Sequence, residues 1–420
     1  MQFYKIVRAL SVLAVLCAAQ VSVWAQTPLG AGNEQPLNVS ASTYAGYDTD
    51  ITTRATRPSS VDTNADTSAF NTGVSLSMVY GHRTPKIGFY TMGSSDFRYY
   101  RAAETVTAPL ATGSAGLDAA LGRRLRFVGS VQSSYLPRFQ LSVLPSTSSV
   151  PTEQPQPTMD YGISSYDVVS YLGTAGLSYQ LDSRSALTAS YGRGQFKYLG
   201  QDYELNTRTM GAGYSRKMTR YATLQLGYSE QGGDYVTGLG PNQQTIKQRT
   251  IDAGVHYSRP LSLSRRTTVG FSTGSTALDN GRETFYTVTG SANLNHQLSR
   301  TWNLGVGYAR RVGLVGGFTE PIMSDSISVR AGGSLGNRVY VSTSAGYANG
   351  AVGMASRGRN YDSTQASSNI NIPITRRRLS FFGTYFYYRH SFEQSVSLPI
   401  GLVPHMSRHG VRAGLTLTIY

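Results

Sequence analysis

The stretch LNHQLSRTWNLGVGY, residues 294–308, decides the fold. It consists of an alternating run, a short polar step that contains Ser299 and Arg300, and a second alternating run that ends at Tyr308. Residues 177–191, LSYQLDSRSALTASY, follow the same plan. Alternation of apolar and polar residues is the pattern of a β-strand with one apolar face. Each stretch therefore predicts a β-hairpin.

The same hairpin recurs along the chain. Alternating segments of about ten residues fill most of residues 37–420, and no helical period is convincing after residue 26. Eight short basic turns connect pairs of segments: GHRTP at 81, GRR at 122, DSRS at 182, RKMTR at 216, LSLSRR at 261, LSRT at 298, GNR at 336 and TRRR at 375. With a first strand near 37–47 and a last strand from Val411, this predicts 18 strands, within a range of 16 to 20.

Strand length and asymmetry favour a membrane. Strands of about 9 to 11 residues match a tilted bilayer crossing, whereas soluble strands average about five or six residues. The connections opposite the basic turns are longer and collect Gly, Pro, Asn and most of the acids. Because lipid forbids an open sheet edge, we expect an all-β fold: a closed antiparallel transmembrane β-barrel with short periplasmic turns and longer extracellular loops.

Aromatic residues near the strand ends share the apolar register and predict interfacial girdles. They are Tyr80, Tyr179, Tyr191, Tyr228, Tyr257, Trp302, Tyr308, Tyr347 and Tyr387. At this point the chain resembles bacterial outer-membrane β-barrels of the porin and polysaccharide-export type over essentially all of residues 37–420. The resemblance is architectural, and it implies the outer membrane of a Gram-negative-type bacterium and a role in transport.

The first 25 residues read as a cleaved signal peptide. Lys5 and Arg8 precede a short apolar run, and Val23 and Ala25 fit a peptidase site before Gln26. Residues 26–36 would form a short lead and residues 37–420 the barrel, with a Pro-rich extracellular loop near 138–166. Cys17, the one cysteine, lies in the signal. The exported chain is therefore expected to carry no disulfide and no thiolate metal site.

The formal net charge is +15, and 33 of the 38 basic residues are arginine. An exported protein is not expected to bind nucleic acid, so outer-membrane lipid and an anionic solute or polysaccharide are the predicted partners. The register opposite the apolar one is mostly Ser, Thr, Gly, Asn and Gln, which suits a water-filled lumen.

Several arginines share this inner register. The pore-lining candidates are Arg98, Arg124, Arg126, Arg208, Arg311, Arg330 and Arg412. Unpaired guanidinium groups on the wall would favour anions. The acids Asp96, Asp118 and Asp252 share the register, so paired wall charges are the equal alternative for any one arginine.

A second set of arginines lies in the basic turns and predicts a periplasmic rim. It comprises Arg83, Arg123, Arg184, Arg216, Arg220, Arg265, Arg266, Arg300, Arg338, Arg376, Arg377 and Arg378. Such a rim would gather an anionic solute or polymer from the periplasm, while contact with lipid phosphates is the slightly favoured alternative.

The predicted function is an aqueous, Arg-rich conduit for anionic solutes or polymers. Two alternatives stay open: an exopolysaccharide secretion barrel with periplasmic export partners, and an adhesive or structural barrel that acts through its loops. The sequence has no HExxH, GxSxG, phosphate-binding glycine loop or metal cluster. We therefore expect no enzyme, no catalytic residues, no metal and no cofactor, and the sequence does not indicate an oligomeric state.

Overall fold

The computed structural model describes most of the chain from residue 37 onward. The described residues are 37–49, 68–101, 106–138, 163–200, 203–237, 244–257, 266–279, 284–313, 318, 320–336, 338–353, 359–375, 378–396, 398 and 404–419. The predicted signal peptide and lead, and most of the Pro-rich loop, lie outside these residues.

The chain forms 18 strands. They are β1 Leu37–Asp48, β2 Ala69–Arg83, β3 Ile87–Arg101, β4 Val106–Ala120, β5 Leu125–Arg138, β6 Ile163–Gln180, β7 Ser185–Tyr198, β8 Tyr203–Lys217, β9 Ala222–Thr237, β10 Gln244–Tyr257, β11 Thr267–Asp279, β12 Thr284–Gln297, β13 Trp302–Gly313, β14 Ile322–Leu335, β15 Val339–Val352, β16 Tyr361–Pro373, β17 Leu379–Phe392 and β18 His405–Thr418.

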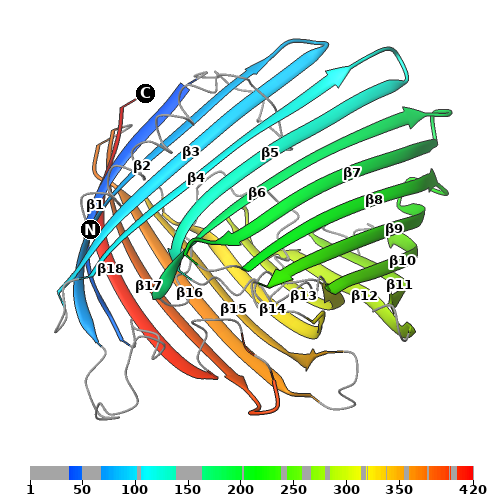
Figure 1. Ribbon diagram of the computed structural model, residues 1–420. Coiled ribbons are helices and arrows are strands. Elements are labelled where there is room, and N and C mark those ends of the chain that lie inside the picture. The colour runs from blue at the N-terminus through cyan, green and yellow to red at the C-terminus, as the bar shows by residue number, and fades with distance from the viewer. Residues whose placement is uncertain are drawn as a thin grey trace.

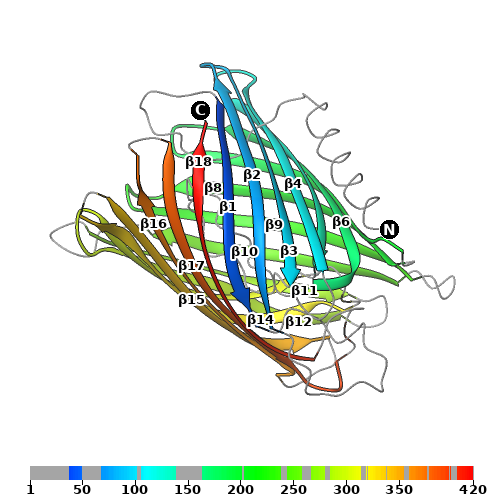
Figure 2. The same ribbon diagram turned by 90° about the vertical axis from the view of Figure 1, so that its left-hand side faces the viewer.

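The strands form one closed sheet (Figure 1). Each strand pairs antiparallel with its sequence neighbours, and β1 also pairs with β18, beside which it lies in Figure 2. At this seam Ser40 faces Thr418 and Asp48 faces Gly410. The prediction of a closed 18-stranded antiparallel barrel is confirmed.

The strands are longer than the predicted ten residues or so, with 12 to 18 residues each. The first strand continues to Asp48, the last begins at His405, and β6 begins at Ile163 inside the range expected for the Pro-rich loop. The extra residues lie mostly on the side of the longer connections. We call this side the loop end and the other side the short-turn end.

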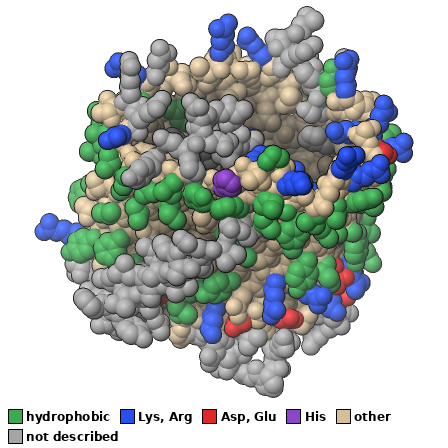
Figure 3. All heavy atoms as spheres, turned by 90° about the horizontal axis from the view of Figure 1, so that it is seen from above, with side chains coloured by type: hydrophobic (Ala, Val, Ile, Leu, Met, Phe, Trp, Pro, Cys, Tyr) green, Lys and Arg blue, Asp and Glu red, His purple; other side chains and the backbone are tan. Residues whose placement is uncertain are grey.

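The outer face of the barrel is apolar. Five outward residues illustrate this with exposed fractions of 43–62%: Leu177, Leu187, Leu226, Ile251 and Val411. Figure 3 shows hydrophobic side chains in a broad band, with Lys and Arg at its margins. A belt of this extent needs an apolar surrounding. Among the described residues no helix is long and apolar enough to cross a membrane.

The quoted hairpin fits this wall. Leu294 pairs with Val306 and His296 with Leu304 on the outer face, while Asn295 pairs with Gly305 on the inner face. Directly paired residues share a face of the sheet. By the same register, the nine predicted girdle residues all lie on the outer face.

Candidate functional site: the lumen

The lumen differs between its two ends. On the short-turn side, inner side chains such as Ser190, Gln225 and Asn303 are exposed. On the loop side most inner side chains are buried, as Tyr100 and Tyr235 illustrate at 0% and 1% exposure, whereas those of β12 are half-buried and Arg311 on β13 is exposed. The described structure is therefore polar and open toward the short turns and filled toward the loops.

Much of the filling is an apolar cluster that we call the aromatic plug. Its members are Val168, Tyr198, Tyr203, Leu205, Tyr235, Ile246, Phe318, Ile322, Val352, Tyr361 and Phe392. They join the wall of β6–β10 to the wall of β14–β17. Phe318, from the β13–β14 connection, packs on Phe392 with ring centroids 5.8 Å apart, and Tyr361 stacks on Phe392 at 5.7 Å. The plug thus spans the lumen between two separate parts of the wall.

Next to the plug, a charged cluster lies on the inner face of the seam. It comprises Asp48, Asp96, Arg98, Arg408 and Arg412, from β1, β3 and β18. Arg408 Nη2 lies 2.8 Å and Arg412 Nη2 3.4 Å from Asp48 Oδ2. Arg98 Nε lies 2.6 Å from Asp96 Oδ2. Buried charges are tolerated when they are paired, and each charged side chain of this cluster lies within 3.4 Å of one of opposite sign.

Aromatic side chains and glycines complete the charged cluster. Tyr44 donates a hydrogen bond to Asp96 at 2.7 Å, and the Arg412 guanidinium lies 4.9 Å from the Phe386 ring centroid. A Cβ on Gly46 would lie 2.8 Å from Arg412 Cγ, and one on Gly410 would collide with Phe386. Glycine at these two positions lets large side chains lie flat against the strand backbone.

The structure places the predicted pore-lining arginines in different environments. Arg98 and Arg412 are on the inner face but only 3% and 4% exposed, within the charged cluster. Arg126 is on the inner face near the short turns and pairs with Asp118. Arg311 and Arg330 also face the lumen, since they continue the registers of Gly305 and Ser328. Neither has a carboxylate partner among the described residues.

Two of the expected positions need correction. Arg124 lies in the turn between β4 and β5 rather than in the wall. Arg208 lies on the outer face, because it pairs with Arg193 at the level next to the outward pair Tyr191 and Met210. Near Arg208 the outer face of β8 carries Glu204 and Asn206 as well as Met210. Both faces of the strand are therefore polar there, and the sequence alone does not fix which face points outward.

The predicted rim arginines lie at the short-turn end, in or beside the turns. The described ones, namely Arg83, Arg123, Arg184, Arg216, Arg220, Arg266, Arg300, Arg338 and Arg378, all have exposed side chains. Arg265, Arg376 and Arg377 lie outside the described residues. Gly336 has a φ of 64° and allows the chain to reverse before Arg338.

Sequence reasoning missed Arg408 and the role of Asp48. The sequence predicts a first strand near 37–47, which leaves Asp48 among the acids of the longer connections. The face on which Asp48 lies was nevertheless predictable, because every second residue before it, Ser42, Tyr44 and Gly46, belongs to the inner face. The pairing of Asp48 with Arg408 joins residues 360 apart in sequence, which no local pattern encodes.

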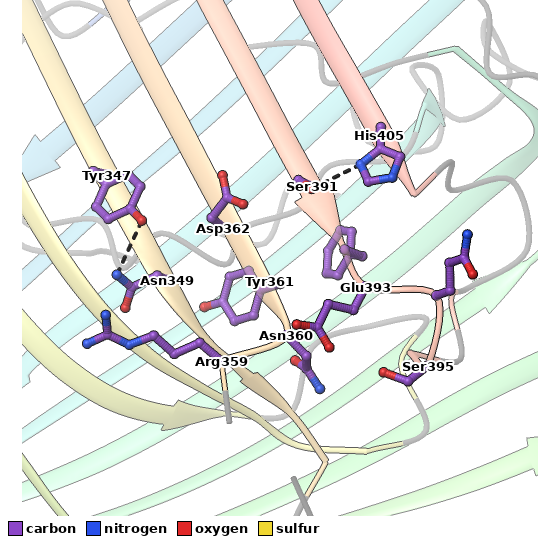
Figure 4. Close-up of a pocket in the computed structure, with 12 residues that line it drawn as sticks. Tyr347, Asn349, Arg359, Asn360, Tyr361, Asp362, Ser391, Glu393, Ser395 and His405 are labelled. Carbon is purple, nitrogen blue, oxygen red and sulfur yellow. Dashed lines mark hydrogen bonds between the residues drawn. The ribbon is translucent and has the colours of Figure 1, made fainter. Parts of the chain in front are cut away.

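A separate cavity of about 650 Å³ opens at the loop end of β15–β18 (Figure 4). Ser391 Oγ and His405 Nδ1 in its lining are 2.9 Å apart. Asp362 lies opposite Ser391 in the register, on the side away from His405 in Figure 4. In a catalytic triad the acid hydrogen-bonds to the histidine, which in turn contacts the serine. Here the acid lies beside the serine instead, so the three residues do not form a triad. Within the described ranges, no group of three or more His, Cys, Asp and Glu side chains is placed to hold a metal ion.

No protein-family model matches this sequence, and no curated protein matches it. Among solved structures, OccK2 (OpdF) of Pseudomonas aeruginosa in complex with glucuronate is similar at 12% identity and a TM-score of 0.46, covering 93% of this chain and 100% of that one. OpdQ of the same organism is similar at 11% identity and a TM-score of 0.44, covering 91% of this chain and 98% of that one. The siderophore receptor PirA of Acinetobacter baumannii is similar at 9% identity and a TM-score of 0.44, covering 92% of this chain and 81% of that one. Likeness at this level does not reveal what this chain binds.

Proposed function

We propose that this chain is an outer-membrane barrel of a Gram-negative bacterium that conducts small solutes in the manner of a porin, with a preference for anions. The observation that carries the proposal is the closed barrel with an apolar outer belt and a polar inner face on the short-turn side. A wall of this kind is stable in lipid and holds water inside. The short turns would lie in the periplasm.

The preference for anions is proposed from the inner-wall charges that have no carboxylate partner. Arg311 and Arg330 are of this kind among the described residues, and Arg330 Nη2 donates a hydrogen bond to Asn295 at 3.2 Å. Asp252 is an exposed inner-wall acid that opposes them. Cations that line a pore raise the local concentration of anions.

The aromatic plug would make the conduit narrow on the loop side. A solute that enters from outside would have to pass between the plug and the wall or displace part of the plug. This arrangement favours selective or gated conduction over a wide general-diffusion pore. Polymer export and adhesion have no specific support among the described residues.

Planar-bilayer recordings of the refolded protein in a salt gradient test the proposal. We expect discrete conductance steps and a reversal potential that indicates a preference for anions. Bilayer insertion without conductance, or a preference for cations, would contradict it. Block by an acidic sugar and not by a neutral one would extend the proposal to a substrate class.

A further inference from the structure

The outer face of β7–β10 changes abruptly from apolar to charged. The last apolar residues toward the loops are Tyr191, Met210, Tyr228 and Ile251, and each is at least 40% exposed. The next outward residues are Arg193, Arg208, Glu230 and Arg249. This boundary marks the level at which a bilayer core would give way to headgroups on the loop side.

Four of the six outward cations on the loop side of β7–β13 lie opposite an acid. Lys197 pairs with Glu204, Arg249 with Glu230, Lys247 with Asp279 and Arg310 with Asp325 in the strand register. Two of these pairs are ion pairs, since Arg249 Nε lies 3.4 Å from Glu230 Oε2 and Arg310 Nη1 3.9 Å from Asp325 Oδ2. Cross-strand charges of opposite sign stabilise a sheet.

Arg193 and Arg208 break this rule, because they lie directly opposite each other. Both side chains are exposed, and neither has a carboxylate partner within the described chain. Arg208 instead contacts Met210 Sδ at 3.5 Å and lies 5.7 Å from the Tyr191 ring centroid. Like charges directly opposite each other destabilise a sheet, so this pair calls for an anion from outside the chain.

The space beside the pair is open and the nearby acids are engaged. On β9 the residue opposite Arg208 is Gly232, and a Cβ there would have nothing within 4 Å. Glu230 accepts a hydrogen bond from Tyr228, and Asp234 accepts one from Thr245. A tetrahedral anion can therefore approach Arg208 over Gly232 and reach Arg193 on the other side.

We propose that Arg193 and Arg208 form a binding site for the phosphate of a membrane lipid in the loop-side leaflet. Guanidinium forks bind phosphate oxygens through paired hydrogen bonds. A lipid is favoured over free phosphate because the pair lies one outward position beyond Tyr191 and Met210. The acyl chains would then lie on the apolar wall of Leu187, Ala189 and Ala212. This site requires the barrel to lie in a membrane but does not require it to conduct.

The test is native mass spectrometry of the detergent-solubilised barrel titrated with lipid A, whose phosphates give it a net negative charge. Phosphatidylcholine, whose phosphate is balanced by choline, serves as the zwitterionic comparison. The double variant Arg193→Gln/Arg208→Gln is compared with Arg101→Gln/Arg389→Gln, which removes two exposed outward cations on β3 and β17. Losing a direct charge-assisted hydrogen bond to a phosphate oxygen weakens binding roughly tenfold, so the site variant, which loses two arginines, should bind lipid A about 100-fold more weakly. The control variant should bind it as the wild type does.

Equal weakening in both double variants would show that net charge alone attracts the lipid, and unchanged binding in the site variant would show that the pair is not a site. Either result overturns the proposal. Displacement of the lipid by an equal concentration of inorganic phosphate would also overturn it in favour of a simple anion site. Conductance of the same preparations tests the proposed transport function independently, because both arginines lie outside the lumen.

Discussion

Replacing Asp48 with asparagine tests whether the charged cluster holds the barrel closed. Asp48 is fully buried on β1, and its carboxylate is shared by Arg408 and Arg412 on β18. Tyr100 on β3 donates a further hydrogen bond to the same oxygen at 3.2 Å. One side chain thus connects three strands at the seam, where the first and last strands meet.

The expected magnitude follows from the charges that remain. The cluster holds three arginines and two aspartates, so it carries one net positive charge, and Asp48→Asn raises this to two. Removing one partner of a buried ion pair typically costs about 3–5 kcal/mol, because the other charge stays buried without compensation. Adding Arg408→Gln restores the original net charge and should recover about 1–3 kcal/mol of that loss.

Urea unfolding of the barrel refolded in detergent measures these changes. Trp302 fluorescence is a suitable probe because this residue lies on β13, away from the cluster, and donates a hydrogen bond to Ser334 O at 3.1 Å. Asp252→Asn is the matched control, since Asp252 is an exposed inner-wall acid and should change stability by less than about 0.5 kcal/mol. A loss below about 1 kcal/mol for Asp48→Asn, or strict additivity with Arg408→Gln, would refute the role of the cluster.

Three further predictions concern the lumen and a turn. Arg330→Gln should lower the anion-to-cation permeability ratio about two- to fivefold, because one charge in an aqueous lumen is worth about 0.5–1 kcal/mol; an unchanged reversal potential would contradict the proposed role. Phe392→Ala should raise single-channel conductance by loosening the aromatic plug, and equal conductance would show that the plug does not limit flow. In the β6–β7 turn, hydrogen bonds from the backbone N–H groups of Arg184 and Ser185 lower the pKa of Asp182. The stabilising effect of the Asp182 carboxylate is complete above its unfolded-state pKa and is lost as the pH falls through its lower folded-state pKa. Wild type and Asp182→Asn should therefore differ in urea midpoint at pH 7 and converge in strong acid. A difference that stays constant with pH would contradict this prediction.

The closed barrel was predictable because one local rule repeats along the chain. Each hairpin carries its own alternation and its own basic turn, so the eight turns and 18 strands follow without knowledge of distant contacts. Closure follows from the membrane, since a free edge in lipid is too costly. The pairing of β1 with β18 needs no further signal.

The organisation of the lumen was not predictable in the same way. Alternation with a period of two gives the face of the sheet on which a side chain lies, but not what stands across the barrel from it. Arg98 follows Asp96 and Arg330 follows Ser328 on the inner face, and alternation alone does not show that Arg98 is buried at 3% exposure within the charged cluster while Arg330 has no acid beside it among the described residues. Arg208 shows the converse limit, since its strand has too few apolar residues to fix the register.

The position of each arginine therefore matters more than the formal charge of +15. The charged cluster leaves one net charge, Arg126 is neutralised by Asp118, and Arg208 lies outside the wall. The described rim arginines lie exposed at the short-turn end, where salt screens their charges over about 8–10 Å. A preference for anions inside the lumen then depends on Arg311 and Arg330, so substituting these two should abolish it even though more than thirty basic residues remain.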